Sequence, residues 1–236
     1  MKGTPSDVRF LLFLLAASLA ANVWLVRRIW TAGPAAARAA IPSREEFLGG
    51  LAKQPRRPIR GLVDETRVLV VKFNDYQCPP CRTAHERFEP VIARLQAAHP
   101  GEIKFVVKDF PLESECNPTI PDSQHAAACE AAAAVRLARR TDKADELAEW
   151  LFAHQRTLTP ESVWAGARSV THFSYTESDY QAALAEVKED VKLGTQLGIP
   201  GTPTFLVNGL LVEAPTSELF EAAIEHEWSR AQPPGR

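Results

Sequence analysis

Residues 68–81 decide the fold, and they read VLVVKFNDYQCPPC. The apolar, β-branched first half is typical of a strand that is buried on both faces. Beyond it, apolar residues recur at helical spacing, at Phe88, Val91, Ile92 and Leu95, so Cys78 and Cys81 open a helix. Two cysteines at this spacing can exchange a disulfide, and the positive end of the helix dipole favours the Cys78 thiolate. The stretch therefore predicts thiol–disulfide chemistry.

A second informative stretch lies far downstream, at residues 201–209, which read GTPTFLVNG. Here Pro203 enters a short apolar strand, where a proline is tolerated because its missing N–H need not join the sheet. Asn208-Gly209 then predicts a tight hairpin turn. The pattern predicts two short strands, Thr204–Val207 and Leu210–Val212, near the end of the domain.

Together these stretches resemble the DsbA-like oxidoreductases of the thioredoxin superfamily. Residues 73–82, FNDYQCPPCR, match the pattern F-x-D-Y-x-C-P-x-C-R, and KDFPL (108–112), HAA (125–127) and GTPT (201–204) follow in the family's order. The resemblance covers roughly residues 57–230. It implies an α/β thioredoxin fold over residues 58–232, with a helical insertion at about 115–197.

The resemblance also implies roles for particular residues. Cys78 is the nucleophile that forms the mixed disulfide, and Cys81 resolves it. Pro203 has a cis peptide bond, and Thr202 before it offers backbone groups to an extended substrate peptide. The Thr202 hydroxyl is also placed to reach the Cys78 sulfur. The alternatives are an ordinary loop proline at 203 and a zinc site at the cysteines, but a zinc site needs a second ligand pair that the sequence lacks.

The two prolines between the cysteines are expected to tune the site. Neither Pro79 nor Pro80 has a backbone N–H, so only Cys81 can donate to a thiolate at the helix start. We expect Cys78 to be less acidic than in DsbA proteins that carry C-P-H-C, and its disulfide to be a milder oxidant. No cofactor and no metal are expected.

Cys116 and Cys129 form the second cysteine pair, and a structural disulfide is the interpretation we favour. In the chain-entropy model such a loop contributes about 3 kcal/mol. The alternative is an electron relay to Cys78 and Cys81. Four cysteines without a leftover thiol are typical of an exported protein.

Three charged or titratable residues, Lys72, His85 and His125, lie in or near the motifs. Lys72 stands where thioredoxin and DsbA carry a buried acid, which argues against a proton shuttle at this position. We expect Lys72 to extend to the surface or to pair with Asp75 or Asp109. His85 is expected to be a solvated surface residue rather than a group that tunes Cys81, and His125 is expected only to begin a helix.

The first 30 residues differ from the rest, because Phe10 to Val26 is apolar apart from Ser18 and Asn22. This stretch is long for a signal-peptide core and short for a membrane span. We favour an uncleaved anchor over residues 1–30, since cleavage near Ala20 leaves an apolar tail. A cleaved signal peptide, which yields a soluble periplasmic protein, is the alternative. The basic pair at 27–28 opposes an extracytoplasmic domain, whereas disulfide chemistry favours one.

Further elements follow from local signals. Residues 31–57 are predicted to be a tether with a short helix from Ser43 to Leu51, and 59–61 an edge strand. Strands are expected at 67–73 and 102–107. Helix starts are expected in the insertion at Asp122-Ser123, at Thr141-Asp142, at Thr159-Pro160 and at Thr176, and a last helix is expected over Thr216–Trp228.

The expected function is a membrane-anchored, extracytoplasmic thiol–disulfide oxidoreductase, a monomer that donates the Cys78–Cys81 disulfide to unfolded or reduced exported proteins. A DsbB-like or vitamin-K-epoxide-reductase-like membrane protein is the implied reoxidant. A net charge of −2 over 236 residues gives no indication of nucleic-acid binding. The alternatives are a reductase or isomerase of the same fold, and a redox-silent peptide-binding chaperone that uses Thr202 and Pro203.

Overall fold

The computed structural model describes residues 18, 22–24, 41–59 and 66–231. The chain divides into two units, Met1–Pro42 and Ser43–Arg236. In the first, residues 22–24 are helical. Within the described residues no helix has the length and apolar character needed to cross a membrane. The predicted anchor or signal over 1–30 and the tether residues 31–40 fall outside the described part, apart from 18 and 22–24.

The folded unit is built on a four-stranded sheet in the order β2-β1-β3-β4. The strands are β1 (Val68–Asn74), β2 (Ile103–Asp109), β3 (Thr204–Val207) and β4 (Leu210–Leu211). β1 runs parallel to β2 and antiparallel to β3, and β3 pairs antiparallel with β4. All seven residues of β1 are buried, as expected for an apolar strand at the centre of a sheet.

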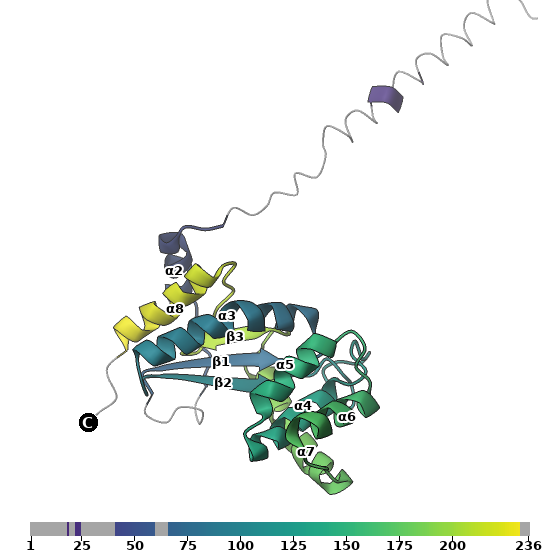
Figure 1. Cartoon of the computed structure of the whole chain (residues 1–236). Coiled ribbons are helices and arrows are strands. Elements are labelled where there is room, and N and C mark those ends of the chain that lie inside the picture. The colour runs from purple at the N-terminus through teal and green to yellow at the C-terminus, as the bar shows by residue number, and fades with distance from the viewer. Residues whose placement is uncertain (1–17, 19–21, 25–40, 60–65, 232–236) are drawn as a thin grey trace, which may run out of the picture. The chain divides into compact units, whose positions relative to one another are not determined.

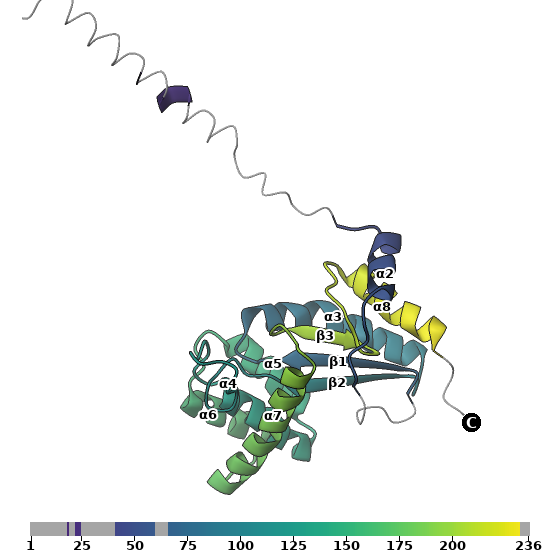
Figure 2. The ribbon, with the colours of Figure 1, turned by 180° about the vertical axis from the view of Figure 1, so that it is seen from behind.

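Helices precede, interrupt and follow this sheet (Figure 1). In chain order they are α2 (Arg44–Ala52), α3 (Pro79–Ala98), α4 (Ala128–Ala138), the 3-10 turn η1 (Arg139–Thr141), α5 (Ala144–His154), α6 (Pro160–Thr171), α7 (Glu177–Gln196) and α8 (Ser217–Arg230). The insertion of α4 to α7 lies between β2 and β3 in the chain. It gathers beyond the ends to which β1 and β2 point (Figures 1 and 2).

Alternate residues of β1 bury against different helices, because successive strand side chains point to opposite faces. Val68 and Val70 pack in a cluster with α3 and with Phe220 of α8. Leu69 and Val71 pack in a second cluster, to which α4 and α7 contribute. The central strand is thus covered on both faces, and the thioredoxin fold with a helical insertion that the sequence predicted is confirmed.

The local capping signals proved reliable. Ser43, Thr159 and Thr176 each form a capping box at the start of a helix, α2, α6 and α7 respectively. Thr216 caps α8 through its side chain. Helix α2 packs on α8, so the folded unit starts at Ser43, earlier than the domain boundary at 58 that the sequence suggested.

Two predicted elements differ from the structure. The helix expected from Asp122-Ser123 begins only at Ala128, because residues 112–127 form a loop held by side-chain contacts and α4 is capped from outside its own sequence. Ile59 is buried but is not in a strand, and the rest of the predicted edge strand, 60–61, falls outside the described residues.

Candidate active site

The two cysteines lie where β1 ends and α3 begins. Cys78 is the N-cap residue of α3, and Pro79 and Pro80 are its first two helical residues. Cys81 is completely buried, and Cys78 is 4% exposed. The Cys81 N–H donates to the Cys78 carbonyl at 3.0 Å. Since the prolines have no N–H, Cys81 supplies the first backbone donor of this turn.

The pKa values of the two thiols are shifted in opposite directions. The pKa of Cys78 is lowered to about 6, chiefly by a hydrogen bond from the Cys81 thiol, with the Cys81 N–H and Thr202 adding to the effect. Burial and the nearby charge of Asp75 oppose it. Burial raises the pKa of Cys81, and its contacts with Cys78 raise it further. The dithiol therefore carries its thiolate on Cys78, which is the residue expected to be the nucleophile.

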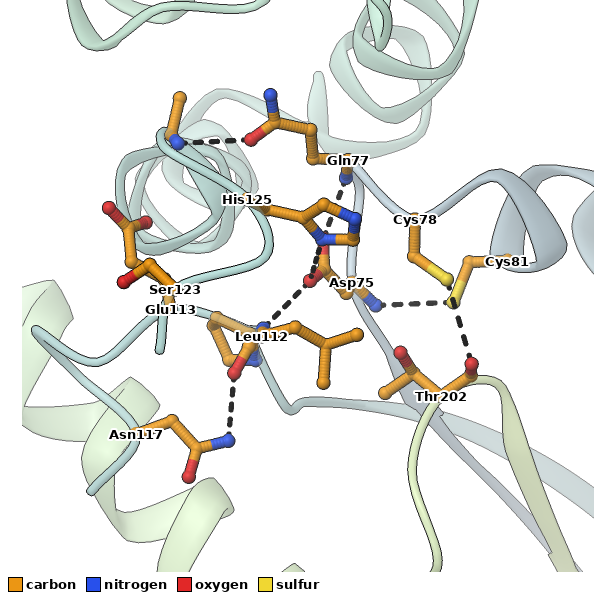
Figure 3. A network of polar contacts seen from close by, with 12 residues as sticks. Asp75, Gln77, Cys78, Cys81, Leu112, Glu113, Asn117, Ser123, His125 and Thr202 are labelled. Atoms are coloured by element: carbon orange, nitrogen blue, oxygen red, sulfur yellow. Dashed lines mark hydrogen bonds and ion pairs between the residues drawn. The ribbon is translucent and has the colours of Figure 1, made fainter. Parts of the chain in front are cut away.

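The loop before β3 covers the sulfur of Cys78. The Thr202–Pro203 peptide bond is cis, as the resemblance implied. The Cys78 thiol donates to the Thr202 carbonyl at 3.5 Å (Figure 3). The Thr202 hydroxyl is buried and has no hydrogen-bond partner among the described residues, so it is free to donate to a thiolate at Cys78.

An apolar groove lies directly beside the dithiol. It has a volume of about 470 Å³, and its walls are Pro79, Pro80, Thr83, Ala84, Arg87, Phe88, Pro203 and Ala214. Residues of α3 form one wall, and the cis-proline loop contributes to the other. The predicted substrate-binding residue Pro203 and the predicted tuning residues Pro79 and Pro80 thus share one surface.

Asp75 is the centre of a buried network next to the cysteines (Figure 3). Its carboxylate accepts from the Gln77 N–H at 2.7 Å, from the Leu112 N–H at 2.8 Å and from His125 Nδ1 at 2.8 Å. Its backbone N–H approaches the Cys81 sulfur at 3.5 Å. Asp75 thus connects the active-site loop to the loop that follows β2.

His125 does not begin a helix, contrary to the sequence prediction. It lies in the loop before α4, and its side chain is 15% exposed. The neighbouring Asp75 carboxylate raises the pKa of its imidazole, and the Cys78 thiolate contributes in the same direction. Ala127, two residues on, donates its N–H to the Gln77 side chain at 3.0 Å, which fixes the same loop to the site.

Lys72 is buried beneath the site but pairs with neither of the acids expected for it. Its side chain is 1% exposed, and its ammonium group lies 2.7 Å from the Glu89 carboxylate on α3. The expected partners are engaged elsewhere, since Asp75 binds His125 and Asp109 binds Arg136. A buried cation needs a nearby anion. For Lys72 on β1, that anion is Glu89 on α3, the helix that packs on the strand.

His85 is not the solvated surface residue that was expected. Its imidazole contacts Glu89 at 2.8 Å and Glu149 at 2.6 Å, and it packs against Phe152 with ring centroids 4.9 Å apart. Hydrogen bonding to Glu89 raises the pKa of His85. His85, Glu89 and Glu149 thus form a cluster of their own on α3 and α5, and all three line a cavity of about 690 Å³.

Cys116 and Cys129 form a disulfide with a Cα–Cα distance of 6.0 Å. Both cysteines are fully buried, in the apolar cluster that covers the second face of the sheet. The bond joins the loop after β2 to the second residue of α4. Cys78 and Cys81 are free thiols and belong to a different apolar cluster. Among the described residues, no cluster of three or more His, Cys, Asp or Glu side chains is arranged to bind a metal.

A sequence profile described as thioredoxin matches residues 59–226. The chain belongs to the thioredoxin family. The match includes the dithiol, the outer disulfide and the cis-proline loop. Family membership and this site together make the protein a thiol–disulfide oxidoreductase.

Solved structures of DsbA-type proteins share the fold. Oxidised BdbD from Bacillus subtilis is 22% identical, with 71% of this chain and 90% of that chain covered and a TM-score of 0.55. A probable DsbA oxidoreductase, SCO1869 from Streptomyces coelicolor, is 19% identical over 72% and 93% of the chains, with a TM-score of 0.53. ScsC from Proteus mirabilis is 17% identical over 97% and 100%, also at 0.53. These likenesses establish a DsbA-like fold.

The curated proteins that match this chain in sequence are named as Na⁺/H⁺ antiporters. The Na⁺/H⁺ antiporter NhaA 3 of Salinispora tropica is 28% identical over 235 residues, which is 93% of this chain. The antiporter NhaA 1 of Salinispora arenicola is 29% identical over 206 residues, or 83% of this chain. This chain spans 33% and 29% of those proteins. It therefore corresponds to a minor part of each relative.

Sequence reasoning missed the partnership of Asp75 with His125 and that of Lys72 with Glu89. A signal for the first existed, because both residues lie in the motifs that carry the family resemblance, D-Y before the cysteines and HAA after β2. No comparable signal marked Glu89, which is one of two acids on α3.

Proposed function

We propose that this protein is an extracytoplasmic oxidase that donates the Cys78–Cys81 disulfide to exported proteins. The observation that carries the proposal is the low pKa of Cys78, about 6, beside the raised pKa of Cys81. A stabilised thiolate stabilises the reduced form of the enzyme. Its disulfide is correspondingly easier to reduce, and therefore a better donor.

The reaction needs only the cysteines and the substrate. A substrate thiolate attacks the Cys78 sulfur, the bond to Cys81 breaks, and Cys81 leaves as a thiolate that takes up a proton. A second substrate thiolate then attacks the mixed disulfide and releases the Cys78 thiolate, so that two electrons pass to the enzyme. Because the Cys78 thiolate is the better leaving group, the second step is favoured at neutral pH.

The surface around the dithiol suits an extended, partly apolar peptide. The apolar groove along Pro80, Phe88 and Pro203 offers room for side chains. The Thr202 carbonyl lies 3.5 Å from the Cys78 sulfur, and we expect the backbone of Thr202 to pair with that of a bound peptide. Unfolded or reduced exported proteins present such segments, whereas folded proteins hide them.

An oxidising compartment and a membrane reoxidant complete the proposal. The buried outer disulfide is of the kind that persists in exported proteins. Two electrons taken from each substrate must leave the reduced dithiol. A quinone-linked membrane protein of the DsbB or vitamin-K-epoxide-reductase type accepts electrons of this kind, and residues 1–30 hold the domain, as a monomer, close to the membrane.

Trapping the thiols in living cells by rapid alkylation tests the proposal. We expect Cys78 and Cys81 to be oxidised at steady state, and the purified protein to oxidise a reduced, unfolded substrate. A dithiol that is fully reduced in cells contradicts an oxidase and favours the reductase or isomerase. Undiminished function of a Cys78→Ser/Cys81→Ser variant favours the chaperone.

A further inference from the structure

The position where related folds carry a buried acid is occupied here by a cation, Lys72, already neutralised by Glu89 at 2.7 Å. The buried carboxylate nearest the thiols in the polar network is that of Asp75, three residues before Cys78. In Figure 3, Asp75 lies between His125 and Cys81, with its carboxylate toward the imidazole and its N–H toward the sulfur. The buried negative charge that acts on the thiols therefore comes from Asp75, in the loop after β1, and not from position 72 in the strand itself.

The Asp75 carboxylate lies among hydrogen-bond donors. It is fully buried, and two backbone N–H groups, from Gln77 and Leu112, donate to it at 2.7 and 2.8 Å. The Asp75 charge opposes ionisation of both cysteines, because a second negative charge close by is unfavourable.

His125 is the ionisable side chain that the described residues place in contact with this carboxylate, at 2.8 Å. Its side chain is 15% exposed, so the imidazole can exchange protons with solvent, whereas the Asp75 side chain is fully buried. The other charged groups that act on it are Glu113, from the loop after β2, and Cys78 itself. By thermodynamic reciprocity, a thiolate that favours the imidazolium is itself favoured by the imidazolium.

We propose that His125 is the charge-compensating residue of the dithiol: while it is protonated it offsets the buried Asp75 charge, and the Cys78 thiolate forms. When the imidazole loses its proton, the Asp75 charge faces the thiolate without compensation. His125 acts through Asp75, so it is a positioning residue rather than a catalytic one. The inference rests on the redox site alone and holds whichever way electrons flow.

The alternative is a purely structural role, in which the His125–Asp75 pair only fastens the loop of residues 112–127 to the active-site loop. Both interpretations predict some loss of thermal stability when His125 is replaced. Only charge compensation predicts a change in Cys78 acidity that depends on Asp75. The test therefore measures Cys78 thiolate absorbance against pH in the full chain, with circular dichroism to verify the fold.

Three substitutions separate the alternatives. His125→Asn removes the positive charge, and we expect it to raise the pKa of Cys78 by about 1 and to weaken the oxidising power of the disulfide in a glutathione equilibrium. His125→Lys keeps a positive charge and should restore both values. In an Asp75→Asn background, His125→Asn should have little further effect, because no buried charge remains to be compensated.

His85→Asn is the matched control. His85 is also paired with carboxylates, Glu89 and Glu149, and lies on the helix that Cys78 opens, but it is absent from the network around Asp75. The His85→Asn substitution should leave the pKa of Cys78 unchanged. An unchanged Cys78 pKa in His125→Asn overturns the proposal, as does an equal shift in His125→Lys or in the Asp75→Asn background. If Asp75→Asn fails to fold, the comparison of His125→Asn with His125→Lys decides.

Discussion

Cys78 and Cys81 are separated by two prolines and remain thiols, whereas Cys116 and Cys129 are 13 positions apart and are joined. All four are buried, so exposure does not distinguish the two pairs. Both pairs also lie in apolar clusters. The polar contacts of the sulfurs distinguish them. Cys78 has a thiol, an N–H and a hydroxyl that favour its anion. Hydrogen-bond donors, rather than access to solvent, determine which cysteines react here.

The largest expected effect separates the members of the active-site pair. Cys81→Ala should accumulate mixed disulfides through Cys78, because the resolving thiol is absent. Cys78→Ala should accumulate none and should lose turnover entirely. Non-reducing gels of cells that express each variant measure this directly. Trapping through Cys81 would reverse the assignment of nucleophile and resolving cysteine.

The outer pair should matter for stability alone. Replacing both cysteines, as Cys116→Ala/Cys129→Ala, should lower the free energy of unfolding by about 3 kcal/mol, because the unfolded chain is no longer constrained. Chemical denaturation measures this loss. The reduction potential of Cys78–Cys81 should stay nearly constant. A large change in that potential with an intact fold would instead favour electron relay between the pairs.

The acid beside the outer disulfide should make that region sensitive to pH. Glu130 is 8% exposed, and burial raises its pKa to about 7. An acid with a raised pKa in the folded state costs stability as pH rises from its ordinary value through about 7. Because Glu130 borders an open pocket, we expect Glu130→Gln to gain only about 1–2 kcal/mol at pH 8. At pH 4 its stability should match that of the wild type; a gain independent of pH would contradict this origin.

The smallest expected effect sharpens the role of donors at Cys78. Pro80→His restores an N–H in the first turn of α3 and adds a neighbour that can carry positive charge. Both changes stabilise the thiolate, so the pKa of Cys78 should fall by about 0.5 and the disulfide should become a stronger oxidant. Thiolate absorbance and glutathione equilibration measure the two. A fixed or higher pKa would show that donor supply does not limit this site.

The fold was largely predictable from the sequence because its signals are local. The apolar run of β1, the side-chain caps of α6 and α7 and the turn at Asn208-Gly209 each act over a few residues, and each appears where it was expected. The start of α4 was mispredicted for the complementary reason. Its N-cap residue Ala127 makes no side-chain cap, and the group that satisfies the helix end is distant in sequence.

The site was predictable only where the chemistry is carried by neighbouring residues. The spacing of Cys78 and Cys81 indicated the reaction, and the donor supplied by Cys81 followed from the missing N–H groups of the prolines. Partners across the fold could not be chosen. Lys72 had several acids within plausible reach, and the one selected, Glu89, depends on how α3 lies over β1. His125 was misread because its partner, Asp75, is 50 positions away.

The N-terminus of helix α4 is capped by Glu113, whose carboxylate accepts a hydrogen bond from the Cys129 N–H at 2.9 Å. Glu113 also accepts the Asn117 N–H through its carbonyl at 3.0 Å, which closes a turn around Cys116. A chain with four cysteines can be oxidised into wrong partnerships. The polar contacts of a single glutamate hold the segments that carry Cys116 and Cys129 next to each other. We therefore expect this helix cap to favour the correct pairing of the cysteines during oxidation.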